Sequence, residues 1–293
     1  MTSKLTNPLW PVLSLLLTAS MWGIVWYPLR LLEERGLGGL WTSLISYGAA
    51  LVLGIVWLLL QRRKWPGHPL AFSVMILAVG WCNVAFVLAV LDGSVVRVLL
   101  LFYLSPLWAL LFGWFILDEK PTFHSWVIFI IGIIGALIML WDADIGLPWP
   151  RDTADWLAVS SGFAFSLSNV MMRRVGHVAL VFKAVASWLG VVIIAAIWIL
   201  LSGAPQPVVE PATIYGAVSL GWFGFIIMTL TVIYGVTHMP VHRSAVILLF
   251  ELVVGAVSSL LLTDEVVQMR EWMGGALILL SAYLAAREQL TES

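Results

Sequence analysis

Glu251 is the acidic residue that stands out in this sequence, because it lies in the middle of an apolar stretch. Residues 244–263 contain no other charged side chain, and Glu251 is well separated from both ends. A carboxylate at the middle of a membrane helix is costly unless it is neutral, paired or in contact with water. Three roles are therefore open: Glu251 carries a coupling proton, it binds the amine of an amino acid or an organic cation, or it pairs structurally with an Arg or a backbone donor.

Large aromatic side chains also lie deep in apolar stretches. Most of the 17 Trp residues fall near the ends of such stretches, as is typical of the membrane interface. A central indole either packs in the bundle or against lipid, or it lines a cavity and stacks on an aromatic or cationic compound. The candidate cavity aromatics are Trp22, Trp81, Trp108, Phe165 and Phe250.

Polar groups accompany these aromatics. Pro106 removes one hydrogen bond from its helix and frees the carbonyl of Phe102. In a membrane such a break faces protein or a wet cavity, although a kink that only serves packing is the alternative. The deep polar side chains either bond between helices or contact a substrate. They are Asn83, Tyr103, Ser105 and Asn169.

The composition excludes several classes of protein. Of the 293 residues, 61% are apolar and 11% are charged, against about 25% charged residues in an ordinary soluble domain. The net charge of -1 offers no basic excess for nucleic acid. The single cysteine, Cys82, excludes an internal disulfide and any zinc site built from several cysteines, and the five His residues lack metal-ligand spacing, so we expect no metal and no cofactor. The chain must sit in a lipid bilayer.

The charged residues divide the chain into ten apolar stretches, each a candidate membrane helix of about 20 residues. The connections are short, and roughly two thirds of the 15 Lys and Arg residues fall on the side of the N-terminus, which predicts that both termini are cytoplasmic. In this count Lys183 belongs to a connection, whereas Arg97 and Arg243 belong either to connections or to the starts of the helices that follow them. No signal peptide is expected. The predicted spans are 9–29, 36–61, 65–91, 98–117, 121–141, 156–172, 184–209, 211–242, 244–263 and 272–286.

The chain also repeats itself at an offset of 146 residues. Arg97 then meets Arg243, Trp126 meets Trp272, and the pairs at 118–119 and 264–265 are both Asp-Glu. Five helices per repeat is an odd number, so the repeats, 1–145 and 146–293, must have opposite orientations, as in many secondary transporters. Arg97 and Arg243 are either structural or gating residues. The same offset relates Glu251 to Ser105.

The stretch 101–108 (LFYLSPLW), followed by Asp118 and Glu119, resembles the fourth helix of an EamA domain, the repeat unit of the drug/metabolite transporter superfamily. The segment 20–23 (SMWG) and the residues around Pro106 are similar to the YddG-type aromatic amino acid exporters, which carry Trp at the positions of Ser105 and Phe165. The resemblance implies an all-α, ten-helix exporter of the inner membrane with an aromatic-lined central cavity.

The leading hypothesis is therefore a secondary carrier that works by alternating access around a cavity at the midplane. A membrane-embedded enzyme is less favoured because the sequence shows no cluster of acids or metal ligands. A channel is less favoured because channels usually need rings of like residues, which a fused inverted pair does not provide. The sequence has no ATP-binding motif, so the energy must come from a gradient or from downhill flow of the substrate. Aromatic amino acids and organic cations both suit midplane aromatics and Glu251. We expect a small-molecule substrate, no enzymatic activity, no nucleic-acid partner and a monomer.

Overall fold

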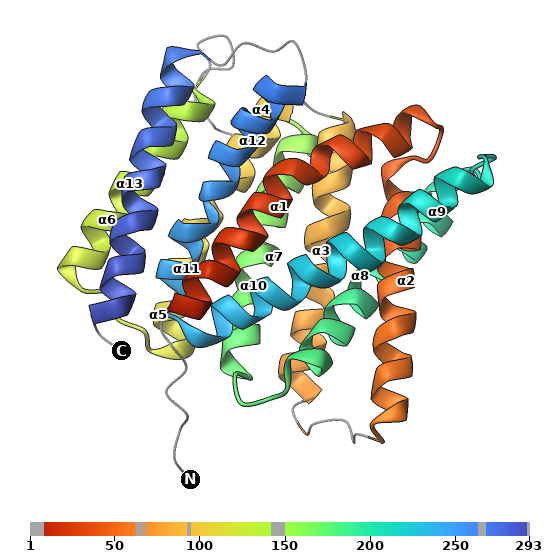
Figure 1. Ribbon diagram of the computed structural model, residues 1–293, viewed down its shortest axis with the longest axis horizontal. Coiled ribbons are helices and arrows are strands. Elements are labelled where there is room, and N and C mark those ends of the chain that lie inside the picture. The colour runs from red at the N-terminus through yellow and green to blue at the C-terminus, as the bar shows by residue number, and fades with distance from the viewer. Residues whose placement is uncertain are drawn as a thin grey trace.

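The computed structural model describes residues 9–62, 67, 69–92, 95–141, 150–262 and 268–291, and these are entirely helical apart from their connections. Seven rods are single helices and three are interrupted, so the described residues form ten rods (Figure 1). The single helices are α1 (Leu9–Glu34), α2 (Gly39–Leu60), α3 (Pro69–Asp92), α6 (Phe123–Leu140), α7 (Thr153–Arg174), α8 (Leu180–Ser202) and α13 (Met269–Thr291). The interrupted rods are α4 (Val95–Phe102) with α5 (Ser105–Leu117); α9 (Pro211–Ser219), the π-helical turn η1 (Leu220–Phe225) and α10 (Ile226–His238); and α11 (Val241–Leu248) with α12 (Phe250–Leu262).

The chain is a multi-pass membrane protein. Seven segments of the described residues are long and apolar enough to cross a bilayer, and α5 is a shorter apolar helix. Many of their large apolar side chains are exposed, as lipid contact requires. The helix α7 is less apolar and rich in Ser, yet most of its side chains are buried. It lies against α3, α4, α5 and α10, so protein rather than lipid surrounds it.

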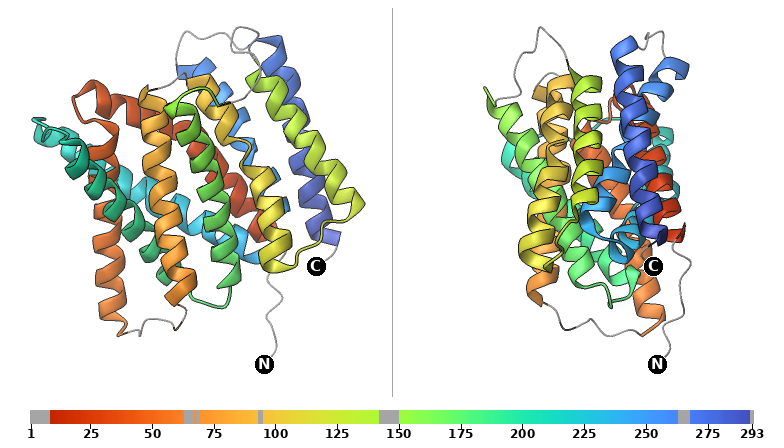
Figure 2. Two further views of the ribbon diagram at one scale, coloured as in Figure 1. Left: turned by 180° about the vertical axis from the view of Figure 1, so that it is seen from behind. Right: turned by 90° about the vertical axis from the view of Figure 1, so that its left-hand side faces the viewer.

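The helices pack as expected for two related halves. The first helix of each half contacts the third and fourth rods of the other half: α1 lies against α10 and α12, and α7 lies against α3 and α5. Likewise α2 contacts η1 while α8 contacts α3, and α6 pairs with α13 at one edge of the molecule (Figure 2). Each half is therefore held mainly by the other.

Glycines allow two of these helices to touch through their backbones. A side-chain carbon at Gly80 of α3 would overlap the carbonyl of Gly190 in α8, and one at Gly190 would overlap the carbonyl of Ile76. Small residues at such contacts let membrane helices approach closely, which supplies packing energy where no hydrophobic driving force exists. The α3–α8 contact thereby fixes one wall of the molecular centre.

The fourth rod of each half is broken near its middle. α4 ends at Phe102 and α5 resumes at Ser105, with Pro106 in its first turn. In the second half α11 ends at Leu248 and α12 resumes at Phe250. Both breaks face the centre of the bundle, and both place polar side chains there. Leu9 of α1 and the end of α13 lie at the same end of the molecule, the lower end in Figure 1.

Candidate central cavity

A cavity of about 160 Å³ lies between the two broken rods. Its wall is built from α1, α2, α3, α7, α8, α10 and both halves of the broken rods. Cavities of this order hold a single aromatic ring, since an engineered apolar cavity of about 150 Å³ binds benzene. The space between the halves is therefore large enough for a small organic molecule.

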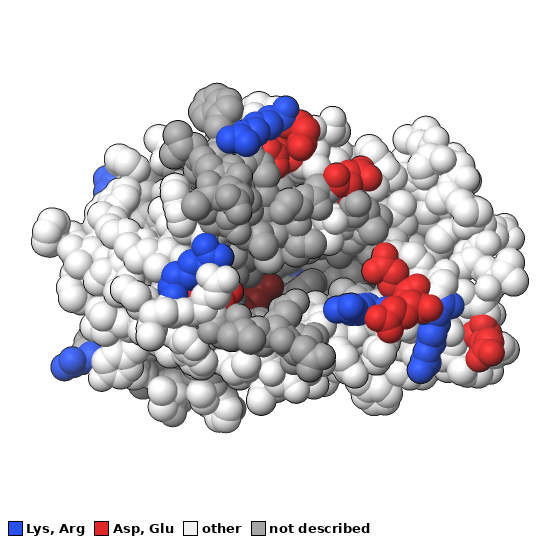
Figure 3. Space-filling model, turned by 90° about the horizontal axis from the view of Figure 1, so that it is seen from above, with Lys and Arg blue, Asp and Glu red and all other residues white. Residues whose placement is uncertain are grey.

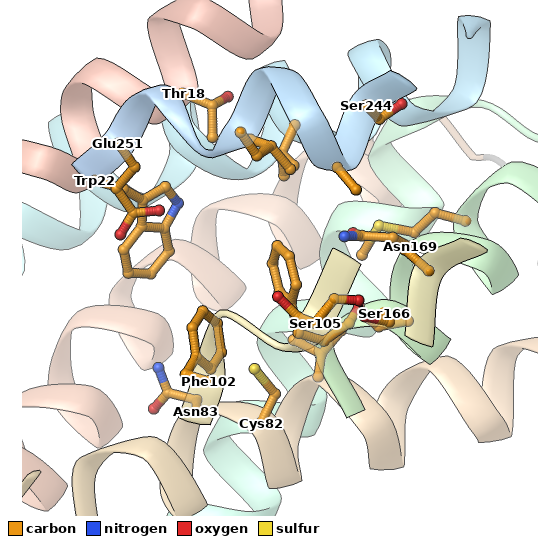
Figure 4. A pocket seen from close by; sticks show the side chains of 18 of the residues that line it. Thr18, Trp22, Cys82, Asn83, Phe102, Ser105, Ser166, Asn169, Ser244 and Glu251 are labelled. Carbon is orange, nitrogen blue, oxygen red and sulfur yellow. Dashed lines mark hydrogen bonds between the residues drawn. The ribbon is translucent and has the colours of Figure 1, made fainter. Parts of the chain in front are cut away.

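Glu251 is the acidic residue among the described side chains that line this cavity. It stands in the first turn of α12, directly after the break, and its carboxylate accepts a hydrogen bond from the hydroxyl of Tyr103 at the other break. Figure 4 shows Glu251 and Trp22 entering the cavity at one end, with Asn169 at the other. The two breaks thus meet through one polar contact across the halves.

Aromatic rings form the wall beside Glu251. Phe102 lies at the centre of this group, 5.1 Å from Phe86 and 5.6 Å from Phe165 between ring centroids. On the other side Tyr47 stacks on Phe225, which also contacts Trp22. These tilted and stacked arrangements are those that aromatic rings prefer. All of these residues except Phe225 line the cavity.

Neutral polar side chains complete the wall. The hydroxyl of Ser166 donates to the carbonyl of Ser105 at 2.6 Å, which ties α7 to the start of α5. Gly162 of α7 lets the carbonyl of Phe102 approach closely, next to the helix break. The side-chain oxygen of Asn83 is buried without a hydrogen-bond partner among the described residues. An unpaired buried acceptor in a cavity wall is available to a donor group of a ligand.

The structure brings eight of the predicted site residues to the cavity and leaves three others elsewhere. Lining it are Trp22, Asn83, Tyr103, Ser105, Pro106, Phe165, Asn169 and Glu251. Trp81 instead donates to the hydroxyl of Ser160 at 3.2 Å, and Trp108 packs against Phe112 and Phe163. Phe250 packs against the hydrophobic core. These three have the expected depth but face other helices, because depth along a helix does not fix the direction of a side chain around it.

Arg243 is placed in the core of the lower end. It is 4% exposed and forms an ion pair with Glu288 of α13 at 3.1 Å, and Glu288 also accepts from Ser125 at 2.7 Å. Arg243 lies in the first turn of α11, at the start of its helix as predicted, and it is buried rather than part of a connection. Arg97 belongs to α4, and its side chain lies outside the described residues.

A second polar cluster joins the two halves at the lower end. Glu119, after α5, binds the guanidinium of Arg173 at the end of α7 and accepts from the backbone N–H of Val241 at 2.8 Å. Arg173 also donates to the carbonyl of Thr237 in α10 at 3.0 Å. Seen from the opposite end, Lys and Arg side chains lie beside Asp and Glu side chains near the periphery of the molecule (Figure 3).

Several cavity residues were not predicted from the sequence. Thr18, Tyr47, Phe102, Ser166 and Ser244 line the cavity, and single Ser and Thr residues in apolar helices carry no signal that separates them from packing residues. Lys183 was assigned to a connection, but it lies in the first turn of α8 and is fully buried. Its position at the edge of a predicted span concealed it.

The described residues form ten helical rods in two interlocked halves, with a polar and aromatic cavity between the broken helices. This architecture is that of a membrane carrier. Two stretches of the chain, residues 9–141 and 152–287, match the EamA-like transporter family. The chain therefore belongs to this family of the drug/metabolite transporter superfamily, and it is a secondary transporter rather than an enzyme.

The fold is also found among solved structures. One chain, described only as "Crystal structure of protein", is 18% identical, with a TM-score of 0.77 over 94% of this chain and 97% of the other. At this identity the likeness concerns the fold alone. No curated protein matches the chain.

Proposed function

We propose that this transporter exports small amphipathic metabolites that join an aromatic ring to a positive amine, with aromatic amino acids as the leading substrates. The observation that carries the proposal is the position of Glu251, a carboxylate in a cavity wall whose other described side chains are aromatic, aliphatic or neutral polar. A protonated amine at Glu251 would form a charge-assisted hydrogen bond, while the substrate ring rests against Phe102 and Phe165.

Alternating access would move the substrate. The polar cluster around Glu119 and Arg173 at the lower end supports a conformation that is closed below. With both termini in the cytoplasm, the upper end faces outward. Separation of Glu119 from Arg173 would accompany the opposite opening, and the two halves would rock around the cavity.

Organic cations are the second candidate substrates. Among the described lining residues there is no Lys or Arg, so the wall offers a charged partner for an amine but only neutral donors for a carboxylate. A compound with a cationic nitrogen and no carboxylate satisfies Glu251 and leaves no charge of its own unpaired. The two candidate substrate classes, aromatic amino acids and organic cations, therefore differ in whether they carry a carboxylate.

Counterflow in proteoliposomes tests the proposal. Purified protein is loaded with unlabelled compound, and uptake of labelled Phe, Trp, Leu, Asp, tryptamine and methyl viologen is compared. We expect saturable exchange of Phe and Trp and none of Asp. Glu34→Gln, at an exposed position, is the matched control for substitution of an acid and should exchange like the wild type. Absence of exchange for every aromatic amine and amino acid would overturn the proposal.

A further inference from the structure

Lys183 is a buried cation without a buried anion. Its side chain is 0% exposed, and its ammonium donates to the hydroxyl of Thr237 at 2.7 Å and to the carbonyl of Met172 at 3.4 Å. Both partners are neutral. No ion pair to Lys183 is found within the part of the chain that the structure describes.

This arrangement differs from that of the other cations at the lower end. Arg173 and Arg243 are each paired with a glutamate. An ammonium group has three donors, and Lys183 uses two of them. Full burial also prevents the side chain from reaching the lipid headgroups, which is the usual solution for a lysine near a helix end. A charged residue kept inside a membrane protein at such a cost is by default functional.

Lys183 lies directly beneath the cavity. Met172, whose carbonyl accepts from its ammonium, lines the cavity, and so does Ser187, one helical turn further along α8. The hydroxyl of Ser187 donates to the backbone carbonyl of Lys183 at 2.9 Å. Thr237 connects the ammonium to the lower cluster, because its own carbonyl accepts from Arg173. Opening of the lower end therefore moves the partners of Lys183.

The described wall of the cavity lacks a cation, and Lys183 supplies one. A zwitterionic substrate with its amine at Glu251 brings a carboxylate that meets no cation in the described wall. We propose that Lys183 is the carboxylate-binding residue of the transport cycle: when the lower end opens, its ammonium leaves Thr237 and binds the carboxylate of the substrate. This inference rests on the proposed function and narrows its substrate class to zwitterionic amino acids.

Matched pairs of compounds test the inference. Phe and phenethylamine share a ring and an amine, and only Phe has a carboxylate. We expect Lys183→Met to raise the half-saturating concentration of Phe in counterflow by at least about tenfold, the size of one lost charged hydrogen bond, and to leave that of phenethylamine unchanged. Lys183→Arg, which keeps the charge, should retain Phe exchange. Equal losses for both compounds, or no loss for either, would overturn the inference.

A second variant covers the case in which Lys183→Met does not fold. Thr237→Val keeps the shape of Thr237 and removes the hydroxyl that Lys183 binds. We expect it to lower the half-saturating concentration of Phe and not that of phenethylamine, because Lys183 is released. If Lys183 only joins α8 to α10, Thr237→Val weakens both alike, and the inference fails.

The wild type separates the two proposals. Exchange of phenethylamine without exchange of Phe would overturn the carboxylate site and leave transport of organic cations standing. Exchange of neither compound would overturn the proposed function and, with it, the role of Lys183.

Discussion

The two halves of the chain break the same helix at the same place but equip the breaks differently. α4 ends at Phe102 and α11 ends at Leu248, positions that the repeat offset of 146 residues relates. After the break the first half has Ser105 and Pro106, whereas the second half has Glu251 and Leu252. Both repeats thus share the helix break, but only the second repeat places a charged residue, Glu251, directly after it.

This difference shows that proline is not needed for the break. In the second half the N–H of Leu249 donates to Val246 at 3.2 Å and the N–H of Leu252 donates to Leu249 at 3.0 Å. These are the tighter bonds of a 3₁₀ turn, which often mark a functional site inside a helix. A nearly symmetric scaffold with a single acid would bind a cationic substrate in one orientation in both open states.

The largest effect is expected at the buried ion pair of the second half. Arg243→Met removes the cation that pairs with the buried Glu288 and should lower the free energy of unfolding by about 3–5 kcal/mol. Replacing both residues with apolar ones should recover most of this loss. Thermal unfolding in detergent measures both. The control is Arg30→Met, whose exposed pair with Glu34 is expected to contribute less than about 1 kcal/mol. A loss at Arg243 no larger than that of the control would contradict the prediction.

The repeat offset extends the same comparison to the first half. It relates Arg97 to Arg243 and Asp142 to Glu288. Asp142 and the side chain of Arg97 lie outside the described residues, so a second ion pair is a prediction of the repeat alone. Arg97→Asp should destabilise the protein, and addition of Asp142→Arg should restore part of the stability. If the losses of stability are instead additive in the double variant, measured by the same unfolding assay, Arg97 and Asp142 do not form the predicted pair.

A smaller effect is expected for the polar cluster that joins the halves below. Glu119→Gln weakens the contacts to Arg173 and to the backbone of Val241, so the lower end should open more often. Cys82 is the one cysteine in the chain and lines the cavity, so it reports access. We expect its labelling by an impermeant maleimide from the lower side to rise about tenfold, the equivalent of 1.4 kcal/mol. Unchanged labelling from that side would show that the cluster does not hold the end closed.

The smallest effect is expected at Pro106. Pro106→Ala restores a donor to α5, but the second half keeps its break without a proline. The expected change is less than about 1 kcal/mol in stability and less than about fivefold in transport. Loss of counterflow in this variant would mean that the first break depends on Pro106 and that the two breaks are not equivalent.

The sequence predicts the number and order of the rods because nearly all charged residues lie where spans end. It also identifies Glu251, since an acid at the middle of a span must face something other than lipid. It does not separate Trp22, which lines the cavity, from Trp81 and Trp108, which do not. Apolar side chains suit both lipid and protein contacts, so the periodicity that orients a helix in a soluble protein is weak here.

Lys183 shows the other limit. A cation at the edge of a predicted span is indistinguishable from a connection residue, and the positive charges of connections are what the topology count uses. Only the packing of α8 against α10 and the hydrogen bonds of the ammonium to Met172 of α7 and Thr237 of α10 reveal that it is enclosed. The sequence therefore identifies Glu251 in the cavity but not Lys183, which lies next to the cavity.

In the proposed mechanism Glu251, the acid of the second half, binds the positive end of the substrate. Counterflow of labelled phenethylamine, which has an amine and no carboxylate, tests this when the wild type, Glu251→Gln and Ser105→Ala are compared. Glu251→Gln should raise the half-saturating concentration by about tenfold or more, and Ser105→Ala, which removes the hydroxyl at the equivalent position, by less than about threefold. Exchange by Glu251→Gln that equals the wild type would contradict the account.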